Sequence, residues 1–295
     1  MRLRGIITAL VTPFRDGSVD EDALRKLVDF QVAEGIEGIV PCGTTGEAST
    51  LSYEEHERVI ELTVKWVEGK VPVIAGTGSN STKETIELTE IAKNLGADLA
   101  LVVAPYYNRP SQEGMYRHFR KVAEDVDLPL ILYNIPGRTG VNMLPELVAR
   151  LAQIPNIVAI KEAAGSMQQV ADIFRLTKGE FPIFSGDDNL FLPMMAVGAT
   201  GVISVVSNVV PGKMRMLGQA YLEGDPGKAL SLHVELMPLF AGLFVEVNPV
   251  PVKEALYYMG YMEKDVRLPL CGLSKENSEH VKGLIRDFGL LTRDV

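Results

Sequence analysis

A lysine at the end of a short apolar run, Ile157-Val158-Ala159-Ile160-Lys161, is the residue of this chain best placed for covalent chemistry. A β-branched run of this length predicts a buried strand. Side chains alternate along a strand, so we expect Ile157, Ala159 and Lys161 on one face. Burial lowers the pKa of a lysine, and its neutral amine is a nucleophile toward carbonyl groups. The run alone leaves a second interpretation open, a structural lysine that pairs with Glu162 or extends its amine to solvent.

Eight apolar runs, this one included, alternate with loops rich in hydroxyl groups and glycine and with helical patterns. Such alternation predicts parallel strands joined by helices, and eight of them close a (β/α)8 barrel, an α/β fold. Three further helical patterns near the C-terminus have no strand between them, at residues 230–244, 252–259 and 279–291. We therefore expect a barrel over residues 1–224 and a helical region over 225–295 that packs on it. The predicted strands are residues 6–10, 38–40, 71–75, 99–104, 130–133, 158–161, 183–185 and 201–205.

The active site of such a barrel lies at the C-terminal ends of the strands, so the residues after each run are the candidates. An imine formed by Lys161 would be an electron sink that permits carbanion chemistry. Tyrosine and threonine hydroxyls can donate and accept the protons that each step moves. The segment Gly43-Thr44-Thr45-Gly46 is expected to open a helix and bind a carboxylate, which favours an α-keto acid substrate. The candidates are Thr12, Ser204 and residues 43–47, 76–78, 106–108, 133–134, 161–162 and 185–188.

Neither a metal nor an organic cofactor is predicted. The glycine-rich segments 43–49 and 76–78 lack the remaining residues of a phosphate-binding loop or a dinucleotide fingerprint. Asp187 and Asp188 are expected to cap a helix rather than bind a cation. The histidines show no metal-binding spacing, and we expect each to be a structural surface residue of a helix; they are His56, His118, His233 and His280.

The composition points to a small-molecule partner. The formal net charge is -9 and no basic patch is visible, which argues against binding to nucleic acid or a membrane surface. No run approaches the ~20 apolar residues of a membrane span. Cys42 and Cys271 are far apart in sequence, which fits a reducing compartment such as the cytoplasm better than a disulfide scaffold.

Several motifs resemble those of the pyruvate-dependent class I aldolases, the family of dihydrodipicolinate synthase and N-acetylneuraminate lyase. The resemblance covers essentially the whole chain. The shared motifs are Gly43-Thr44-Thr45-Gly46-Glu47, Tyr133-Asn134-Ile135-Pro136, Ile160-Lys161-Glu162 and Ser185-Gly186-Asp187. The dihydrodipicolinate synthase branch is resembled by Pro105-Tyr106-Tyr107-Asn108-Arg109-Pro110, Gly137-Arg138-Thr139-Gly140 and Asn248-Pro249-Val250-Pro251-Val252-Lys253.

The resemblance implies a reaction and a set of roles. Pyruvate would form an imine with Lys161 and condense with L-aspartate 4-semialdehyde to give 4-hydroxy-tetrahydrodipicolinate, which opens the diaminopimelate and lysine pathway. Tyr133, Thr44 and Tyr107 would relay protons, with Tyr107 reaching in from a neighbouring subunit. Thr45 would hold the pyruvate carboxylate and Arg138 that of the semialdehyde. Gly186 and Ile203 would line the site through their backbone.

The resemblance also implies a homotetramer and, in many relatives, inhibition by L-lysine at a subunit interface. Two departures bear on this inhibition: Tyr53 stands where sensitive relatives often have histidine, and Ala48-Ser49 where they often have Ser-Ala. The positions that resemble the lysine site in whole or part are Ala48, Ser49, His56, Asn80, Glu84 and Tyr106.

Two other functions stay open at the level of sequence. A related aldolase would act on a sugar acid or N-acetylneuraminate, and would want hydroxyl-binding groups in place of Arg138. A non-catalytic barrel that senses a small molecule would lack Lys161 or Tyr133, and both are present.

Overall fold

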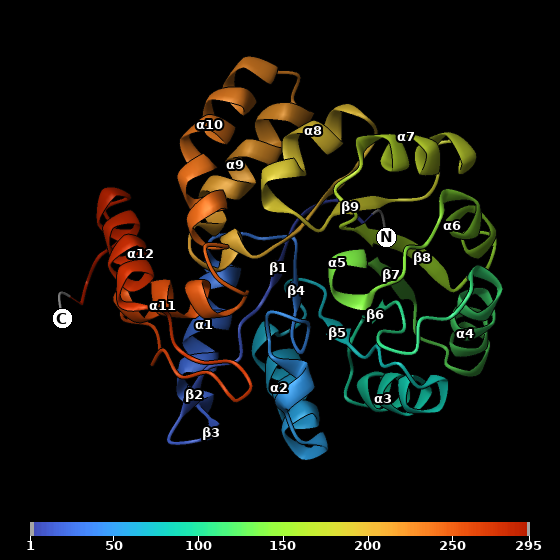
Figure 1. The fold of residues 1–295 in the computed structure, drawn as a ribbon, viewed down its shortest axis with the longest axis horizontal. Helices are drawn as coiled ribbons and strands as arrows, with labels where there is room; N and C mark the ends of the chain where they lie inside the picture. The colour runs from blue at the N-terminus through green and yellow to red at the C-terminus, as the bar shows by residue number, and fades with distance from the viewer. Residues whose placement is uncertain (1–2, 294–295) are drawn as a thin grey trace.

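A barrel of eight parallel strands forms the centre of the molecule (Figure 1). The structure is a computed structural model that describes residues 3–293. The strands are hydrogen-bonded in the order β4-β1-β10-β9-β8-β7-β6-β5, and a parallel bridge between Ile39 and Val73 joins the two ends of the sheet. The predicted (β/α)8 fold is confirmed. The barrel strands are β1 (Gly5–Ala9), β4 (Gly38–Val40), β5 (Ile74–Gly76), β6 (Leu99–Val103), β7 (Leu130–Asn134), β8 (Ile157–Glu162), β9 (Ile183–Ser185) and β10 (Gly201–Ser204).

The strands are buried on both faces, which is why they read as nearly continuous apolar runs. One set of side chains fills the barrel interior, and it includes Ile7, Ile131 and Ile203. The alternate set packs outward against the helices, for example Ile6 and Ile160. The ring of helices therefore covers an apolar outer surface, and the polar groups are left to the ends of the strands.

The expected alternation fails at the start of β8. The register with β7 shifts so that Leu130 pairs with Ile157 and Ile131 with Ala159, which leaves Val158 as an extra residue. Ile157 therefore packs outward, and Val158 contacts the interior cluster instead. This β-bulge changes which side chains face the barrel interior before and after Val158. Ala159 and Lys161 keep the expected common face.

Helices follow most strands, and serine caps fix the N-termini of several. Ser52 and Glu55 form a capping box at the start of α2. The spacing of Ser81 and Glu84 also fits a capping box, but only half of it forms, because Ser81 caps α3 while the Glu84 carboxylate accepts hydrogen bonds from Ser79 and Tyr53. The helices around the barrel are α1 (Glu21–Ala33), α2 (Tyr53–Val67), α3 (Thr82–Asn94), α4 (Gln112–Asp125), α5 (Pro136–Thr139), α6 (Pro145–Leu151), α7 (Met167–Leu176), α8 (Phe191–Ala196) and α9 (Pro211–Leu222). Three 3-10 turns, η1 (Ala48–Thr50), η2 (Asp188–Leu190) and η3 (Val206–Asn208), follow β4, β9 and β10, and a short hairpin pairs β2 (Phe14–Arg15) with β3 (Ser18–Val19).

Three more helices complete the described chain, α10 (Pro226–Gly242), α11 (Val250–Tyr258) and α12 (Lys275–Asp287). Each begins a few residues earlier than the sequence pattern predicts. The helix α10 packs on α9, while α11 and α12 contact each other at one side of the barrel (Figure 1). The division of the chain at residues 224 and 225 stays a prediction. Within residues 3–293, no helix is both long and apolar enough to span a membrane.

A buried ion pair fastens α11 to the barrel. Lys253 Nζ lies 2.5 Å from Glu47 Oε1, and both side chains are almost completely buried. The other carboxylate oxygen of Glu47 accepts the backbone N–H of Arg267 at 3.0 Å. Glu47 belongs to the loop after β4, so this pair holds a strand-end loop against the C-terminal helices.

Candidate active site

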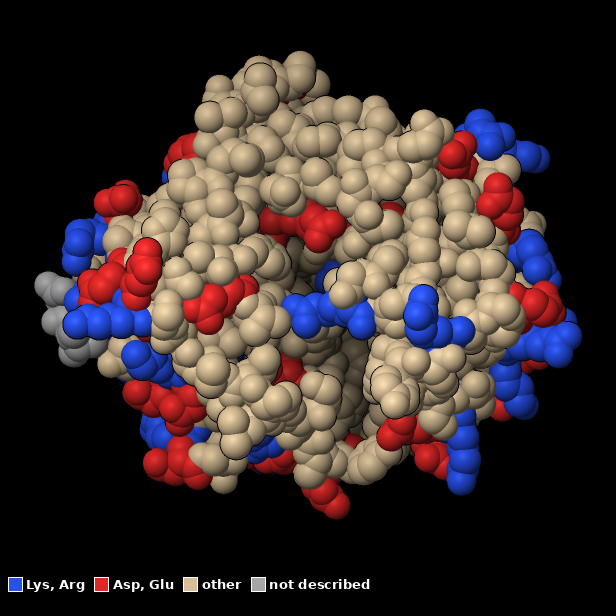
Figure 2. Space-filling view, in the orientation of Figure 1, with Lys and Arg blue, Asp and Glu red and all other residues tan. Residues whose placement is uncertain are grey.

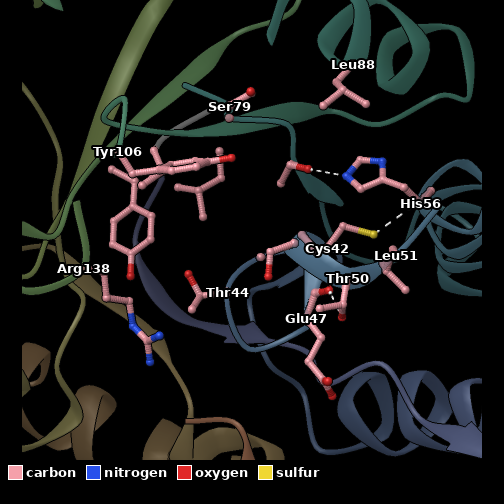
Figure 3. Close-up of a pocket in the computed structure, with 18 of the residues that line it drawn as sticks. Cys42, Thr44, Glu47, Thr50, Leu51, His56, Ser79, Leu88, Tyr106 and Arg138 are labelled. Atoms are coloured by element: carbon pink, nitrogen blue, oxygen red, sulfur yellow. Dashed lines mark hydrogen bonds between the residues drawn. The ribbon is translucent and has the colours of Figure 1, made fainter. Parts of the chain in front are cut away.

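A cavity of about 510 Å³ opens among the loops that follow the barrel strands. Figure 2 shows a hollow on this face with both basic and acidic side chains around it. In Figure 3, Arg138 and Thr44 lie at one end of the cavity, and Leu51, His56 and Leu88 at the other. Its position agrees with the rule that (β/α)8 barrels place their sites at the C-terminal ends of the strands. The predicted residues that line it are Gly43, Thr44, Glu47, Ala48, Ser49, His56, Gly76, Gly78, Glu84, Tyr106, Tyr133 and Arg138.

Lys161 lies next to Tyr133, and Tyr133 lines this cavity. The two residues pair across β7 and β8, and Lys161 Nζ lies 4.4 Å from the centre of the Tyr133 ring. Lys161 is 5% exposed. Burial lowers the pKa of Lys161 to about 8, although the negative charges of Asp187 and Asp188 act in the opposite direction. A substantial fraction of its amine is therefore neutral near physiological pH.

Glu162 is not the partner of Lys161. Its carboxylate accepts hydrogen bonds from Asn134 Nδ2 at 3.0 Å and Gln169 Nε2 at 3.0 Å. It also accepts the backbone N–H of Ala164 at 2.7 Å. The interpretation of Lys161 as half of a structural ion pair with Glu162 is therefore wrong.

Tyr133 and Thr44 supply adjacent hydroxyl groups. Burial raises the pKa of Tyr133 to about 12, while the charge of Arg138 and a hydrogen bond with Thr44 act to lower it. Tyr133 is thus protonated at neutral pH and can donate, and Thr44 can pass a proton on. This pair beside the amine of Lys161 has the chemistry of a proton relay.

Thr45 and Arg138 are both bound by Asn248, which the sequence had marked only as part of the motif at residues 248–253. Asn248 Nδ2 donates to Thr45 Oγ1 at 3.0 Å. The backbone oxygen of Asn248 accepts a hydrogen bond from Arg138 Nη2 at 3.1 Å. Thr45 is buried, whereas Arg138 is exposed at the edge of the cavity. In the sequence, the only signal for this role was a polar residue before two prolines. Sequence spacing did not indicate that Asn248 contacts Thr45.

Gly186 follows β9 and lies beside the lysine. Its N–H donates to the Glu162 carbonyl at 2.8 Å. A Cβ at this position would lie 3.2 Å from Lys161 Cε and 2.6 Å from Ala163 Cβ, so only glycine leaves room for both. Ile203 pairs with Ile7 inside the barrel, where its side chain is completely buried.

Tyr107 points away from the rest of the site within its own chain. Its side chain is 90% exposed, and its backbone has a left-handed φ of 70°. An L-residue adopts this conformation at a cost, which the surrounding loop must offset. The single chain therefore assembles Lys161, Tyr133 and Thr44, and leaves Tyr107 directed outward.

Five of the six positions of the expected lysine site line the same cavity. Asn80 is the exception, and its backbone oxygen accepts from Asn108 Nδ2 at 2.8 Å. His56 was expected at the surface but is buried, with Nε2 at 2.8 Å from the Gly76 carbonyl oxygen. His118 is likewise buried, with Nδ1 at 2.9 Å from Thr82 Oγ1. Each histidine lies on the inward-facing side of its helix, where an oxygen atom is its hydrogen-bond partner.

Two expectations about strand-end loops need correction. Gly43 to Gly46 form a turn that leads into η1 rather than opening a regular helix. Asp187 makes no side-chain cap hydrogen bond, and Asp188 Oδ2 instead accepts the N–H groups of Val205 and Val206 after β10. The carboxylate of Asp188 thus joins two neighbouring strand-end loops. No group of potential metal ligands occurs in the described part of the chain.

A (β/α)8 barrel with a desolvated lysine, a hydroxyl relay and a polar cavity at the strand ends has the architecture of a class I aldolase. The model of the dihydrodipicolinate synthetase family matches residues 2–287. The 4-hydroxy-tetrahydrodipicolinate synthase of Pelobacter propionicus is 55% identical over 288 residues, 98% of this chain and 99% of the relative. The chain belongs to the dihydrodipicolinate synthetase family.

Solved structures agree with this assignment. The chloride-inhibited dihydrodipicolinate synthase of Acinetobacter baumannii in complex with pyruvate is 45% identical, with a TM-score of 0.96 over 98% of this chain and 100% of that one. The dihydrodipicolinate synthase of Cyanidioschyzon merolae with lysine bound is 41% identical, with a TM-score of 0.95 over 98% of this chain and 99% of that one.

Proposed function

We propose that this chain is a lyase that condenses pyruvate with L-aspartate 4-semialdehyde to give 4-hydroxy-tetrahydrodipicolinate. The observation that carries the proposal is the buried Lys161, with its lowered pKa, beside the Tyr133 and Thr44 hydroxyls. The name of the Pelobacter propionicus relative supports the synthase over an aldolase for sugar acids or a non-catalytic sensor. Arg138 at the cavity edge supports it as well, because a guanidinium binds a carboxylate with two parallel hydrogen bonds.

The residues divide the work in order. The neutral amine of Lys161 attacks the ketone carbon of pyruvate, and water leaves as the imine forms. Loss of a methyl proton gives an enamine, which attacks the aldehyde carbon of the second substrate. The amino group of that substrate then attacks the imine carbon, closes the ring and releases Lys161. Tyr133 and Thr44 carry protons to and from the oxygen and nitrogen atoms during these steps.

Each substrate carboxylate has its own anchor in this proposal. Thr45 donates its hydroxyl proton to pyruvate, and Arg138 binds the semialdehyde. Gly186 leaves room beside the imine carbon because it has no side chain. The backbone of Ile203 lines the floor of the same site. The pyruvate complex of the Acinetobacter baumannii relative supports pyruvate as the first substrate.

We further propose a cytoplasmic homotetramer. The exposed Tyr107 would enter the site of a neighbouring subunit and extend the relay there. A second contact would use the weakly charged face around α10, which Figure 2 shows at the top. Large apolar side chains are exposed on it at helical spacing; they are Leu230, Val234 and Met237.

L-Lysine is a proposed inhibitor, supported by the lysine-bound Cyanidioschyzon merolae relative. The residues around Glu84 bear on its strength. Tyr53 and Ser79 both donate to the Glu84 carboxylate and together lower its pKa. Bound lysine would have to share this acid with two hydroxyls. If turnover shows no decrease at millimolar concentrations of L-lysine, inhibition by lysine is contradicted.

The substrate assignment is tested by turnover. The purified protein is mixed with pyruvate and L-aspartate 4-semialdehyde, and both reactants and the cyclic product are followed by mass spectrometry. We expect equal consumption of both and appearance of the cyclic product. Cleavage of N-acetylneuraminate or a sugar acid, without use of the semialdehyde, would contradict the proposal.

A further inference from the structure

Asn248 contacts both residues that the proposed function assigns to substrate carboxylates. It lies between α10 and α11, lines the cavity and is 7% exposed. Its side chain donates to Thr45 Oγ1 and its backbone oxygen accepts from Arg138 Nη2. Although it lies outside the barrel strands, Asn248 therefore contacts the residues that are proposed to bind two different substrates.

The direction of the first hydrogen bond determines what Thr45 can do. A hydroxyl donates one proton and accepts through its lone pairs. Because the Asn248 amide nitrogen occupies a lone pair of Thr45 Oγ1, the hydroxyl proton stays available for an anion. If position 248 offered an acceptor instead, Thr45 would donate to it and present lone pairs to the carboxylate. Such an arrangement would repel a negative charge.

The surroundings hold Asn248 firmly in this arrangement. Lys253, five residues further along the chain, forms the buried ion pair with Glu47 at 2.5 Å. Glu47 is two residues from Thr45, so the two segments are joined at two points. The amide oxygen of Asn248 is buried and has no hydrogen-bond partner within residues 3–293. Among the described residues, the hydrogen bond to Thr45 is therefore what orients the Asn248 amide. In Figure 3 the Glu47 side chain points away from Thr44.

We infer that Asn248 is a positioning residue that sets the preference for carboxylate substrates, by directing the Thr45 proton into the cavity and by holding Arg138. This inference rests on the proposed function. It assigns to the C-terminal region a part in substrate selection, in addition to packing against the barrel.

Replacement of the amide separates its two contacts. Asn248→Asp and Asn248→Ala both keep the backbone oxygen that Arg138 binds, and the Asp variant offers only acceptors to Thr45. The probe is borohydride trapping of pyruvate on Lys161 as a function of pyruvate concentration. We expect the half-maximal concentration to rise roughly tenfold to a hundredfold in Asn248→Asp and less in Asn248→Ala, as for a lost hydrogen bond to a charged group. The KM for the semialdehyde at saturating pyruvate should change less than about threefold, within the scatter of a near-neutral change.

Two comparisons distinguish positioning from a general loss of structure. Pyruvamide is a neutral isostere of pyruvate, so Asn248→Asp should lose the preference for pyruvate over pyruvamide. In a Thr45→Val background, Asn248→Ala should cause no further rise, because residues that act through one contact are not additive. Asn156→Asp is the matched control, since Asn156 precedes β8, at the other end of the strand from Lys161, and donates to the backbone carbonyls of Val126 and Leu128 before β7. It should leave the pyruvate dependence unchanged.

The outcomes are separable. Unchanged pyruvate dependence in both Asn248 variants, equal losses for pyruvate and pyruvamide, or additive effects with Thr45→Val would overturn the inference while wild-type trapping stands. Absence of a pyruvate adduct in the wild type would overturn the proposed function itself. Circular dichroism checks that each variant is folded, and Asn248→Ala with the double variant carries the test if Asn248→Asp does not fold.

Discussion

At the scale of single residues, the site depends on how burial and charge divide the work between Lys161 and Tyr133. Burial moves both groups toward their neutral forms: the pKa of Lys161 falls to about 8 and that of Tyr133 rises to about 12. One group becomes a nucleophile and the other stays a proton donor. The carboxylates of Asp187 and Asp188 limit the effect on Lys161 because they favour its charged form.

The pH dependence of imine formation follows from this balance. At subsaturating pyruvate, the rate should rise with pH through about 8 and then level off, as the amine of Lys161 loses its proton. Asp187→Asn removes a negative charge that raises the pKa of Lys161. The midpoint of the rise in rate with pH should therefore lie at lower pH in this variant than in the wild type. Stopped-flow measurement of imine formation from pH 6 to 10 checks this. Asp172→Asn, a change at a partly exposed residue of α7, is the control, and a midpoint displaced to higher pH in Asp187→Asn would contradict this explanation.

Arg138 should serve the second substrate far more than the first. Arg138→Ala should reduce kcat/KM for the semialdehyde by roughly tenfold to a hundredfold, as expected when a charged hydrogen-bonding group is lost. Pyruvate trapping on Lys161 should persist. Steady-state kinetics with each substrate varied in turn measures both effects, with Arg150→Ala as an exposed control. Equal damage to trapping and turnover would remove Arg138 from its assigned role.

The residues that sequence alone identified are those whose chemistry is unusual in their position, such as Lys161 at a strand end and the paired threonines. Asn248 was not identified, because its role depends on a contact with a residue about two hundred positions away. His56 and His118 were placed wrongly for a related reason. A helical pattern tells which residues share a face, but not which polar partner lies opposite.

At the scale of elements, the loops after β4 and β9 are held by buried charges. Glu47 joins the first loop to α11, and Asp188 joins the second to the end of β10. Strand positions were predicted well because short apolar runs between glycine-containing loops have few alternatives. The bulge at Val158 was not, since an extra residue leaves the apolar composition of a strand unchanged.

Removal of one partner from the buried ion pair between Lys253 and Glu47 should destabilise the protein strongly. Lys253→Met removes one partner and leaves the Glu47 carboxylate buried without it, which should lower the free energy of unfolding by about 3–5 kcal/mol. Chemical denaturation measures the change, provided that both proteins unfold reversibly. Lys121→Met, which breaks an exposed pair with Asp125, should cost less than about 1 kcal/mol. Equal changes in the two variants would show that the buried pair has no special role.

At the scale of the whole molecule, one chain contains most of the proposed site but directs Tyr107 outward. Assembly is therefore part of the proposed mechanism. The exposed apolar residues of α10 lie on a helix distant in sequence from Tyr107, so two kinds of contact between subunits are expected. The closed barrel was predictable from the count of strands, whereas the surfaces used for assembly were not, because isolated exposed apolar residues are common.

The α10 face gives a prediction about assembly. Val234→Glu places a charge on a side chain that is 60% exposed in the single chain and should prevent its burial between subunits. Analytical ultracentrifugation should show a tetramer for the wild type and a dimer for this variant, with pyruvate trapping retained. Lys275→Glu on α12 is the control. An unchanged tetramer in Val234→Glu would place the second contact elsewhere.

Mass spectrometry after borohydride reduction in the presence of pyruvate shows whether Lys161 forms the imine with pyruvate. We predict one pyruvate-derived adduct per chain in the wild type, mapped to Lys161 by peptide analysis. Lys161→Ala should remain folded and carry no adduct. An adduct on another lysine, Lys253 included, or labelling that persists in Lys161→Ala, would contradict the account.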